Sequence, residues 1–295
     1  MHQNPHNIHA PVMLADILSY TSPQKGDKYL DVTAGYGGHA QAILELTGNY
    51  KESVLVDRDE KAIAELKSKF GHTGIGLLRQ DYLSVSQDML AHHRQFDVIV
   101  ADLGVSSLHL NEVSRGFSFT EDAPLDMRMD QRQPITARDI VNHSSESDLA
   151  EILWRYGEEP KARQIARQIV RNRPINTTGQ LAAIASRAWP GYSRNHPATR
   201  TFQAIRIVVN DELAQLSKAL PLWLKLLAPS GRIAVLSFHS LEDRIVKQFF
   251  VSESGDRYDA VLTLLTKHPV TPGPQEIAIN PRSRSAKLRA AAKQK

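Results

Sequence analysis

Four strand-like runs in the first third of the chain each carry an aspartate at or near the C-terminal end. The runs are 29–32, 54–57, 77–81 and 98–102, and their aspartates are Asp31, Asp57, Asp81 and Asp102. In an open α/β sheet, ligands bind in the crevice outside the carboxyl ends of the strands. Acids in that crevice suit a ligand with ribose hydroxyls or a positive charge. The pattern therefore predicts a nucleoside-type cofactor, and the run of acids favours a cationic one.

The composition is ordinary for a soluble globular protein. The chain has 295 residues, of which 41% are hydrophobic and 23% charged, and no apolar run is long enough to span a bilayer. The N-terminus lacks a positive stretch followed by an apolar one, so no secretory signal is expected. Cysteine is absent, which excludes disulfides and cysteine-ligated zinc and favours a cytoplasmic enzyme. No cluster of residues has metal-ligand spacing, so no metal is predicted.

Strand and helix patterns alternate through the first part of the chain, which predicts parallel strands joined by right-handed crossovers. Between about residues 109 and 210 only helical patterns are convincing, and Ser147 is the expected N-cap of one helix there. A strand pattern returns at 231–238. The simplest account is an α/β fold with a helical domain inserted between strands four and five. The expected bounds are 1–108 and 211–295 for the sheet domain and 109–210 for the insert.

The glycine-rich stretch after the first strand admits two cofactors. Residues 35–40, Gly-Tyr-Gly-Gly-His-Ala, satisfy the loose dinucleotide pattern, and Asp57 has nearly the spacing of a ribose-binding acid. A nicotinamide-dependent dehydrogenase is therefore one interpretation. Asp31 favours S-adenosylmethionine, because an acid before the loop would face a cationic amino acid group, whereas it would repel a pyrophosphate. Asp81 and Tyr82 would supply a carboxylate and a ring for adenine, and such a stack contributes about 1–3 kcal/mol.

Basic residues gather in three places outside the expected cofactor half. One helical stretch and the segment after it contain Arg155, Lys161, Arg163, Arg167, Arg171 and Arg173, followed by Arg194, His196, Arg200 and Arg206. Residues 282–295 hold six more basic residues and no acid. The three clusters favour a phosphate-rich substrate. The C-terminal segment either binds RNA or pairs through residues 285–290 as a last strand, with its arginines facing water.

Seven short strings in the chain occur in an order that is specific to one family. They are DLGVSS at 102–107, RGFSF at 115–119, PLDMRMD at 124–130, YGEE at 156–159, HPATRTFQA at 196–204, SFHSLEDR at 237–244 and NPRSRSAKLR at 280–289. Together they resemble the bacterial small-subunit ribosomal RNA cytosine-N4 methyltransferase family, RsmH or MraW. The resemblance extends from Pro11 to Arg289.

The resemblance implies a class I, Rossmann-like S-adenosylmethionine-dependent methyltransferase sheet with an inserted all-helical domain. It implies small-subunit ribosomal RNA as substrate, either naked or in an assembled small ribosomal subunit. By matching position, the cofactor-binding residues are Gly37, Gly38, His39, Asp57, Tyr82, Asp102 and His109. Three positions depart from the family pattern: Tyr36 replaces the usual arginine, Tyr82 replaces phenylalanine, and Leu108-His109 replaces proline and glutamine.

The implied reaction requires a group that accepts a hydrogen bond from the target amine. The exocyclic amine of cytosine is a poor nucleophile because its lone pair is delocalised into the ring. Asp102 is the first candidate for a catalytic acceptor, with Ser106 and the backbone carbonyls of residues 103–107 as alternatives. Asp102 could instead only bind the cofactor. His239 could act as a base, although a polar residue at a strand end more often fixes a loop. A non-catalytic RNA-binding protein of the same fold is a further interpretation.

Overall fold

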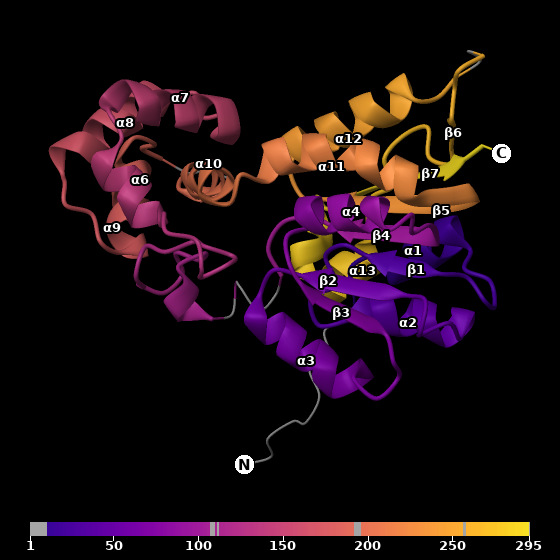
Figure 1. Cartoon of the computed structure of the whole chain (residues 1–295). Helices are drawn as coiled ribbons and strands as arrows, with labels where there is room; N and C mark the ends of the chain where they lie inside the picture. Colours follow the sequence, from indigo (N-terminus) through magenta and orange to yellow (C-terminus); the bar gives the residue numbers. More distant parts are fainter. Residues whose placement is uncertain (1–10, 107–109, 111, 192–195, 256–257, 295) are drawn as a thin grey trace. The chain divides into compact units, whose positions relative to one another are not determined.

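The computed structural model describes residues 11–106, 110, 112–191, 196–255 and 258–294. The chain divides into two compact units, shown in Figure 1. Unit 1 comprises the chain up to Gly104 together with Leu213 onwards, and unit 2 comprises Val105–Glu212. Among the helices described, none combines the length and apolar character needed to cross a membrane.

Unit 1 is built on a seven-stranded sheet with the order β3-β2-β1-β4-β5-β7-β6. The strands are β1 (Tyr29–Asp31), β2 (Val54–Asp57), β3 (Gly76–Arg79), β4 (Phe96–Asp102), β5 (Leu227–Ser237), β6 (Leu262–Leu264) and β7 (Lys287–Lys293). β1 to β5 pair in parallel, whereas β7 runs antiparallel to β5 and β6. This sheet, interrupted between β4 and β5 by unit 2, confirms the predicted α/β class and the predicted point of insertion.

Apolar residues alternate along the strands and bury both faces of the sheet. One face packs against α4 (Tyr82–Ala91), α11 (Glu212–Leu226) and α12 (Ser240–Ser252), and the other against α1 (Leu14–Thr21), α2 (Gly38–Thr47) and α3 (Glu60–Phe70) (Figure 1). Leu30 of β1 faces the first group, and Tyr29 faces the second. Trp223 is fully buried, and its indole donates to Ser86 Oγ over 3.0 Å, which joins α11 to α4. Covering both faces is what a parallel sheet requires.

The chain reverses its direction of travel across the sheet between β1 and β4. It proceeds from β1 outward through β2 to β3 and then returns to place β4 on the other side of β1. The register pairs Asp31 with Val100, and the Asp102 amide donates to Thr33 Oγ1 over 2.6 Å. The ends of these two strands therefore lie beside each other at the switch point, where open α/β sheets bind their ligands.

Unit 2 has a hydrophobic core of its own. Its helices are α6 (Ala137–His143), α7 (Glu146–Gly157), α8 (Ala162–Arg171), α9 (Thr178–Arg187) and α10 (Thr199–Asn210), with a short 3-10 helix η1 (Val113–Arg115). Leu149, Ile165, Leu181 and Ile205 come from four of these helices and are fully buried together. Asn210 at the end of α10 accepts from Met129 N and donates to Met127 O, each over 2.8 Å. These contacts hold the irregular segment before α6 against the helices.

The first turn of α7 differs from the expectation. Ser145, rather than Ser147, is the N-cap, and its hydroxyl accepts from Asp148 N over 3.1 Å. Both serines precede acids, but only Ser145 has an acidic residue three positions later that completes the first turn. The expected N-cap at Ser147 was therefore wrong by two residues.

The C-terminal segment forms β7, which confirms the strand interpretation and corrects one detail. Arg289 was expected to face water but is only 6% exposed. Its Nε donates to Asp243 Oδ1 over 2.6 Å, and Lys287 Nζ lies 3.3 Å from Asp243 Oδ2. The arginine turns inward because α12 places a carboxylate against β7. This ion pair fixes the last strand to α12.

Arg289→Ala should destabilise the protein by about 2–4 kcal/mol, because it leaves the carboxylate of Asp243 buried with only Lys287 beside it. Urea unfolding followed by circular dichroism measures this loss. Lys51→Ala, which removes an exposed cation, is the matched control and should change stability by less than about 0.5 kcal/mol. The double variant Asp243→Asn/Arg289→Met should recover part of the loss. Equal stability of Arg289→Ala and Lys51→Ala would contradict a structural role for the pair.

Candidate functional site

The glycine-rich loop after β1 has a backbone that only glycine adopts easily. Gly37 is the N-cap of α2 at φ 75°, and a Cβ on it would lie 2.7 Å from Phe70 Cε2. A Cβ on Gly38 would lie 2.8 Å from Pro11 Cγ. The loop is attached to β2, because Gly35 N donates to Asp57 Oδ2 over 2.9 Å. These glycines therefore let the chain pass closely between α3 and the N-terminal segment at the carboxyl edge of the sheet.

His39 follows the two glycines and is 7% exposed. Its Nε2 lies 2.9 Å from Val12 O, which can only accept, so Nε2 carries the hydrogen and Nδ1 has a free lone pair in the neutral ring. Burial lowers the pKa of His39 below its usual value. The ring is therefore neutral at pH 7, and its Nδ1 faces Asp102 Oδ2 at 3.8 Å.

Asp31 is buried at the end of β1 and is held by its own strand and turn. The Tyr29 hydroxyl donates to Oδ2 over 2.7 Å, and Thr33 N donates to Oδ1 over 3.1 Å. Burial raises the pKa of Asp31 to about 6, although both hydrogen bonds act in the opposite direction. An ionised carboxylate here is costly unless a cation lies nearby.

Asp102 differs from the other aspartates at the strand ends, because one of its carboxylate oxygens lacks a hydrogen-bond partner among the described residues. Its side chain is 28% exposed, yet its Oδ1 atom is buried and has no hydrogen-bond partner among the described residues. Burial, and then the negative charge of Glu242, raise the pKa of Asp102 to about 7. This oxygen can therefore accept a hydrogen bond from a ligand. Its position at the switch point and its raised pKa make Asp102 the strongest candidate for a functional side chain.

Asp57 and Asp81 have structural roles in addition to those predicted. Asp57 is half-buried, and its Oδ1 accepts from Asp59 N over 2.8 Å, while Oδ2 accepts from the glycine loop. A carboxylate oxygen can accept more than one hydrogen bond, so these contacts are compatible with a role of Asp57 in binding a ribose hydroxyl. Asp81 caps α4, because its Oδ1 accepts from Ser84 N over 2.8 Å.

The ring of Tyr82 is buried in the hydrophobic core of unit 1. It is 6% exposed and packs edge-to-face against Trp223 with 5.5 Å between ring centroids. The guanidinium of Arg58 lies 5.8 Å from the centroid of the Tyr82 ring. A stack of this ring on adenine stays a prediction.

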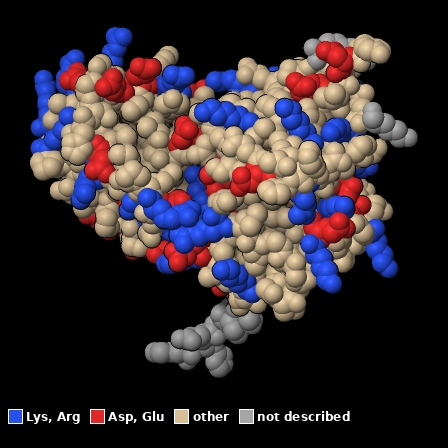
Figure 2. Space-filling model, viewed as in Figure 1, with Lys and Arg blue, Asp and Glu red and all other residues tan. Residues whose placement is uncertain are grey.

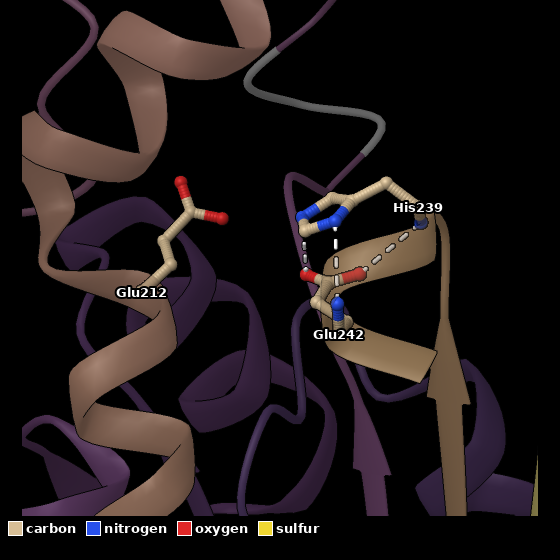
Figure 3. A group of neighbouring side chains, drawn as sticks. All are labelled: Glu212, His239 and Glu242. Carbon is tan, nitrogen blue, oxygen red and sulfur yellow. Dashed lines mark hydrogen bonds and ion pairs between the residues drawn. The ribbon is translucent and has the colours of Figure 1, made fainter. Parts of the chain in front are cut away.

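His239 and Glu242 close the first turn of α12, as Figure 3 shows. Glu242 Oε2 accepts from Phe238 N over 2.9 Å, and the His239 ring accepts weakly from Glu242 N at 3.4 Å. The loop-fixing role of His239 is therefore confirmed. The spacing His-x-x-Glu in the sequence was the available signal for Glu242, whose charge raises the pKa of Asp102. Glu242 was not among the predicted site residues.

The remaining predicted residues lie in unit 2 or outside the described residues. His109 and Arg194 fall outside the residues that the structure describes. Arg206 forms an ion pair with Glu212 over 2.9 Å, so its charge is already engaged within unit 2. The ring of His196 stacks on Phe119 with 4.5 Å between centroids, and Arg200 is exposed.

The family of the chain follows from comparisons with known sequences. The model of the MraW methylase family matches residues 6–294. Ribosomal RNA small subunit methyltransferase H of Cyanothece sp. is 48% identical over 97% of this chain and 95% of its own. The protein of the same name from Acidobacterium capsulatum is 44% identical over 97% of this chain and 98% of its own. Among solved structures, an rRNA methylase from Streptococcus thermophilus aligns with a TM-score of 0.44 at 13% identity, over 100% of this chain and 99% of its own.

Asp102→Asn should stabilise the ligand-free protein at pH 8 by roughly 1–4 kcal/mol and change little at pH 4. The folded state raises the pKa of this carboxyl from 3.8 to about 7, so its contribution to stability falls as pH rises between those values. Thermal unfolding of both proteins at pH 4 and pH 8 measures the difference. Asp88→Asn, at an exposed position on α4, is the control. A stabilisation by Asp102→Asn that is equal at both pH values would contradict the raised pKa.

Proposed function

This chain belongs to the MraW methylase family, and from that premise we propose that it methylates the exocyclic amine of a cytidine in small-subunit ribosomal RNA, using S-adenosylmethionine. The observation that carries the reaction is Asp102, with its unpartnered buried Oδ1 at the switch point of a methyltransferase sheet. Family membership excludes the dehydrogenase that the glycine loop alone left open.

The residues at the carboxyl edge fit a cationic nucleoside cofactor. Asp31 and Asp102 both have pKa values raised by burial, so a neighbouring positive charge would lower both values and favour ionisation. We assign cofactor binding to Gly37, Gly38, His39, Asp57, Tyr82, Asp102 and His109. Asp57 would hold the ribose, and the glycines allow the backbone to approach the ligand closely.

S-adenosylmethionine supplies an activated methyl group on a sulfonium, so the protein mainly has to position the amine and receive its proton. Asp102 can receive the proton of the amine. Its Oδ1 can accept a hydrogen bond from the amine, which turns the amine lone pair towards the methyl group. A pKa of about 7 places the carboxylate close to the value at which a general base is effective near neutral pH.

The retained acids argue against a non-catalytic RNA-binding protein of the same fold. A protein that only bound RNA would gain nothing from two carboxylates that are partly or fully withdrawn from solvent, because their charged forms are costly beside a polyanion. The target base has to be unpaired or turned out of a stack before its amine can reach the site. Unit 2 is proposed to recognise the surrounding RNA.

Methyl transfer from radiolabelled S-adenosylmethionine tests the function directly. Small ribosomal subunits that lack the modification and naked small-subunit RNA are offered as separate substrates, followed by nucleoside analysis. Label on the exocyclic amine of cytidine is the expected result, and the better substrate shows whether assembly precedes methylation. Tight cofactor binding with no label on either substrate would overturn the proposed acceptor.

Asp102→Asn tests the catalytic role. If Asp102 receives the proton, turnover should fall by about 10²–10⁴-fold while cofactor affinity, measured by calorimetry, changes far less. The wild-type kcat/KM for the cofactor should rise with pH through a pKa of about 7, because the ionised carboxylate is the active form, and Asp102→Asn should lack this rise. Asp88→Asn should behave as wild type. Parallel loss of affinity and turnover would show that Asp102 only binds the cofactor.

A further inference from the structure

The C-terminal string NPRSRSAKLR marks a basic segment that the proposed chemistry does not use. No acidic residue occurs from Ile277 to the end of the chain. The cations of β7 have partners within unit 1. Lys287 and Arg289 both contact Asp243. Lys293 Nζ donates to the backbone oxygen of Leu224 over 3.1 Å and to that of Leu227 over 2.6 Å. These three cations therefore hold the strand in place.

Arg282 and Arg284 lie just before β7, on the 3-10 helix η2 (Pro281–Ser285). Both are exposed. Arg284 has no ion pair and no side-chain hydrogen bond with any other described residue. Within the described part of the chain, the charge of Arg284 therefore has no polar partner, unlike the charges of the β7 cations.

The strand register places η2 at the functional edge of the sheet. Lys287, two residues after η2, pairs with Ser237, the last residue of β5. On the other side of β5, Leu236 pairs with Asp102. The segment before β7 is therefore at the same carboxyl edge of unit 1 as Asp102 and the turn at His239.

The backbone that carries Arg284 is fixed rather than loosely attached. Ser283 is fully buried, and its hydroxyl donates to Asn280 O over 2.7 Å. Ala286 is 1% exposed. Helix α13 (Pro274–Ile279) precedes η2, and its Glu276 accepts from Met13 N over 2.6 Å. A guanidinium on such a turn loses less conformational freedom on binding than one on a free tail.

Overall charge does not identify a nucleic-acid surface on this protein. The net charge is only +4, and on the face in Figure 2 lysine and arginine are interspersed with aspartate and glutamate. The contacts of individual cations are therefore more informative than charge density.

We propose that Arg284, with Arg282 beside it on η2, binds backbone phosphate of the RNA strand next to the target cytidine. The inference rests on the proposed function, because it assigns a contact for the same substrate. A guanidinium stays charged at all relevant pH values and binds phosphate oxygens through two parallel hydrogen bonds. Phosphate contacts of this kind set the register of a nucleic acid without reading its sequence.

The test compares Arg284→Ala with wild type in two assays. In methyl transfer, Arg284→Ala should raise the KM for the RNA substrate roughly three- to tenfold at unchanged kcat and unchanged cofactor affinity. In filter binding to a cytidine-containing single-stranded RNA, the slope of log affinity against log salt should become shallower by about 1. The binding assay needs no turnover, so it tests the phosphate contact even if the acceptor base has been assigned wrongly.

Two further variants complete the design. Arg284→Lys keeps the charge and should retain the salt slope of wild type, but it should recover only part of the affinity, because an ammonium cannot form the two parallel hydrogen bonds. Lys25→Ala removes an exposed cation from the loop before β1, at the opposite edge of the parallel strands, and should resemble wild type. An unchanged KM and an unchanged salt slope in Arg284→Ala would overturn the proposal, as would equal losses in Lys25→Ala.

Discussion

The withdrawal of two carboxylates from solvent, complete for Asp31 and partial for Asp102, is the constraint on which the site depends. Burial favours the protonated form of each, and the raised pKa values of Asp31 and Asp102 express that cost. Hydrogen bonds from neighbouring groups offset this energetic cost only in part. Tyr29 and Thr33 donate to Asp31, whereas Oδ1 of Asp102 has no donor among the described residues. The raised pKa values therefore favour a cation as the ligand of this site.

Several strings that carry the family resemblance have structural roles in this protein. Within 124–130, Arg128 makes a two-pronged ion pair with Asp126, and the backbone of Met127 and Met129 binds Asn210. In 237–244, His239 and Glu242 close a helix turn. A residue that identifies the family is therefore not necessarily a residue that touches substrate. Arg284 differs, because its side chain forms no ion pair and no hydrogen bond with any other residue that the structure describes.

The sequence predicted those features that depend on local patterns. Apolar runs ending in aspartate predicted four strands and their common edge, because side chains alternate along a strand and parallel strands share an orientation. Pairings between distant residues could not be predicted in this way. Asp243 and Arg289 are separated by 46 positions, and only the folded chain brings β7 against α12. The same limit applies to Tyr82, whose packing against Trp223 depends on a helix more than a hundred positions later.

The two carboxylate oxygens of Asp102 have different surroundings. Oδ2 faces the neutral ring of His39, while Oδ1 is left to a ligand. Because the carboxylate is buried, its proton affinity depends strongly on the charge beside it. In the proposed reaction, the positive charge of a bound cofactor would favour the ionised form of Asp102. That charge would be lost on methyl transfer, and Asp102 would then receive the proton that the amine releases. The pKa of Asp102 then returns towards its raised value, so the carboxylate becomes a stronger proton acceptor as the proton is released.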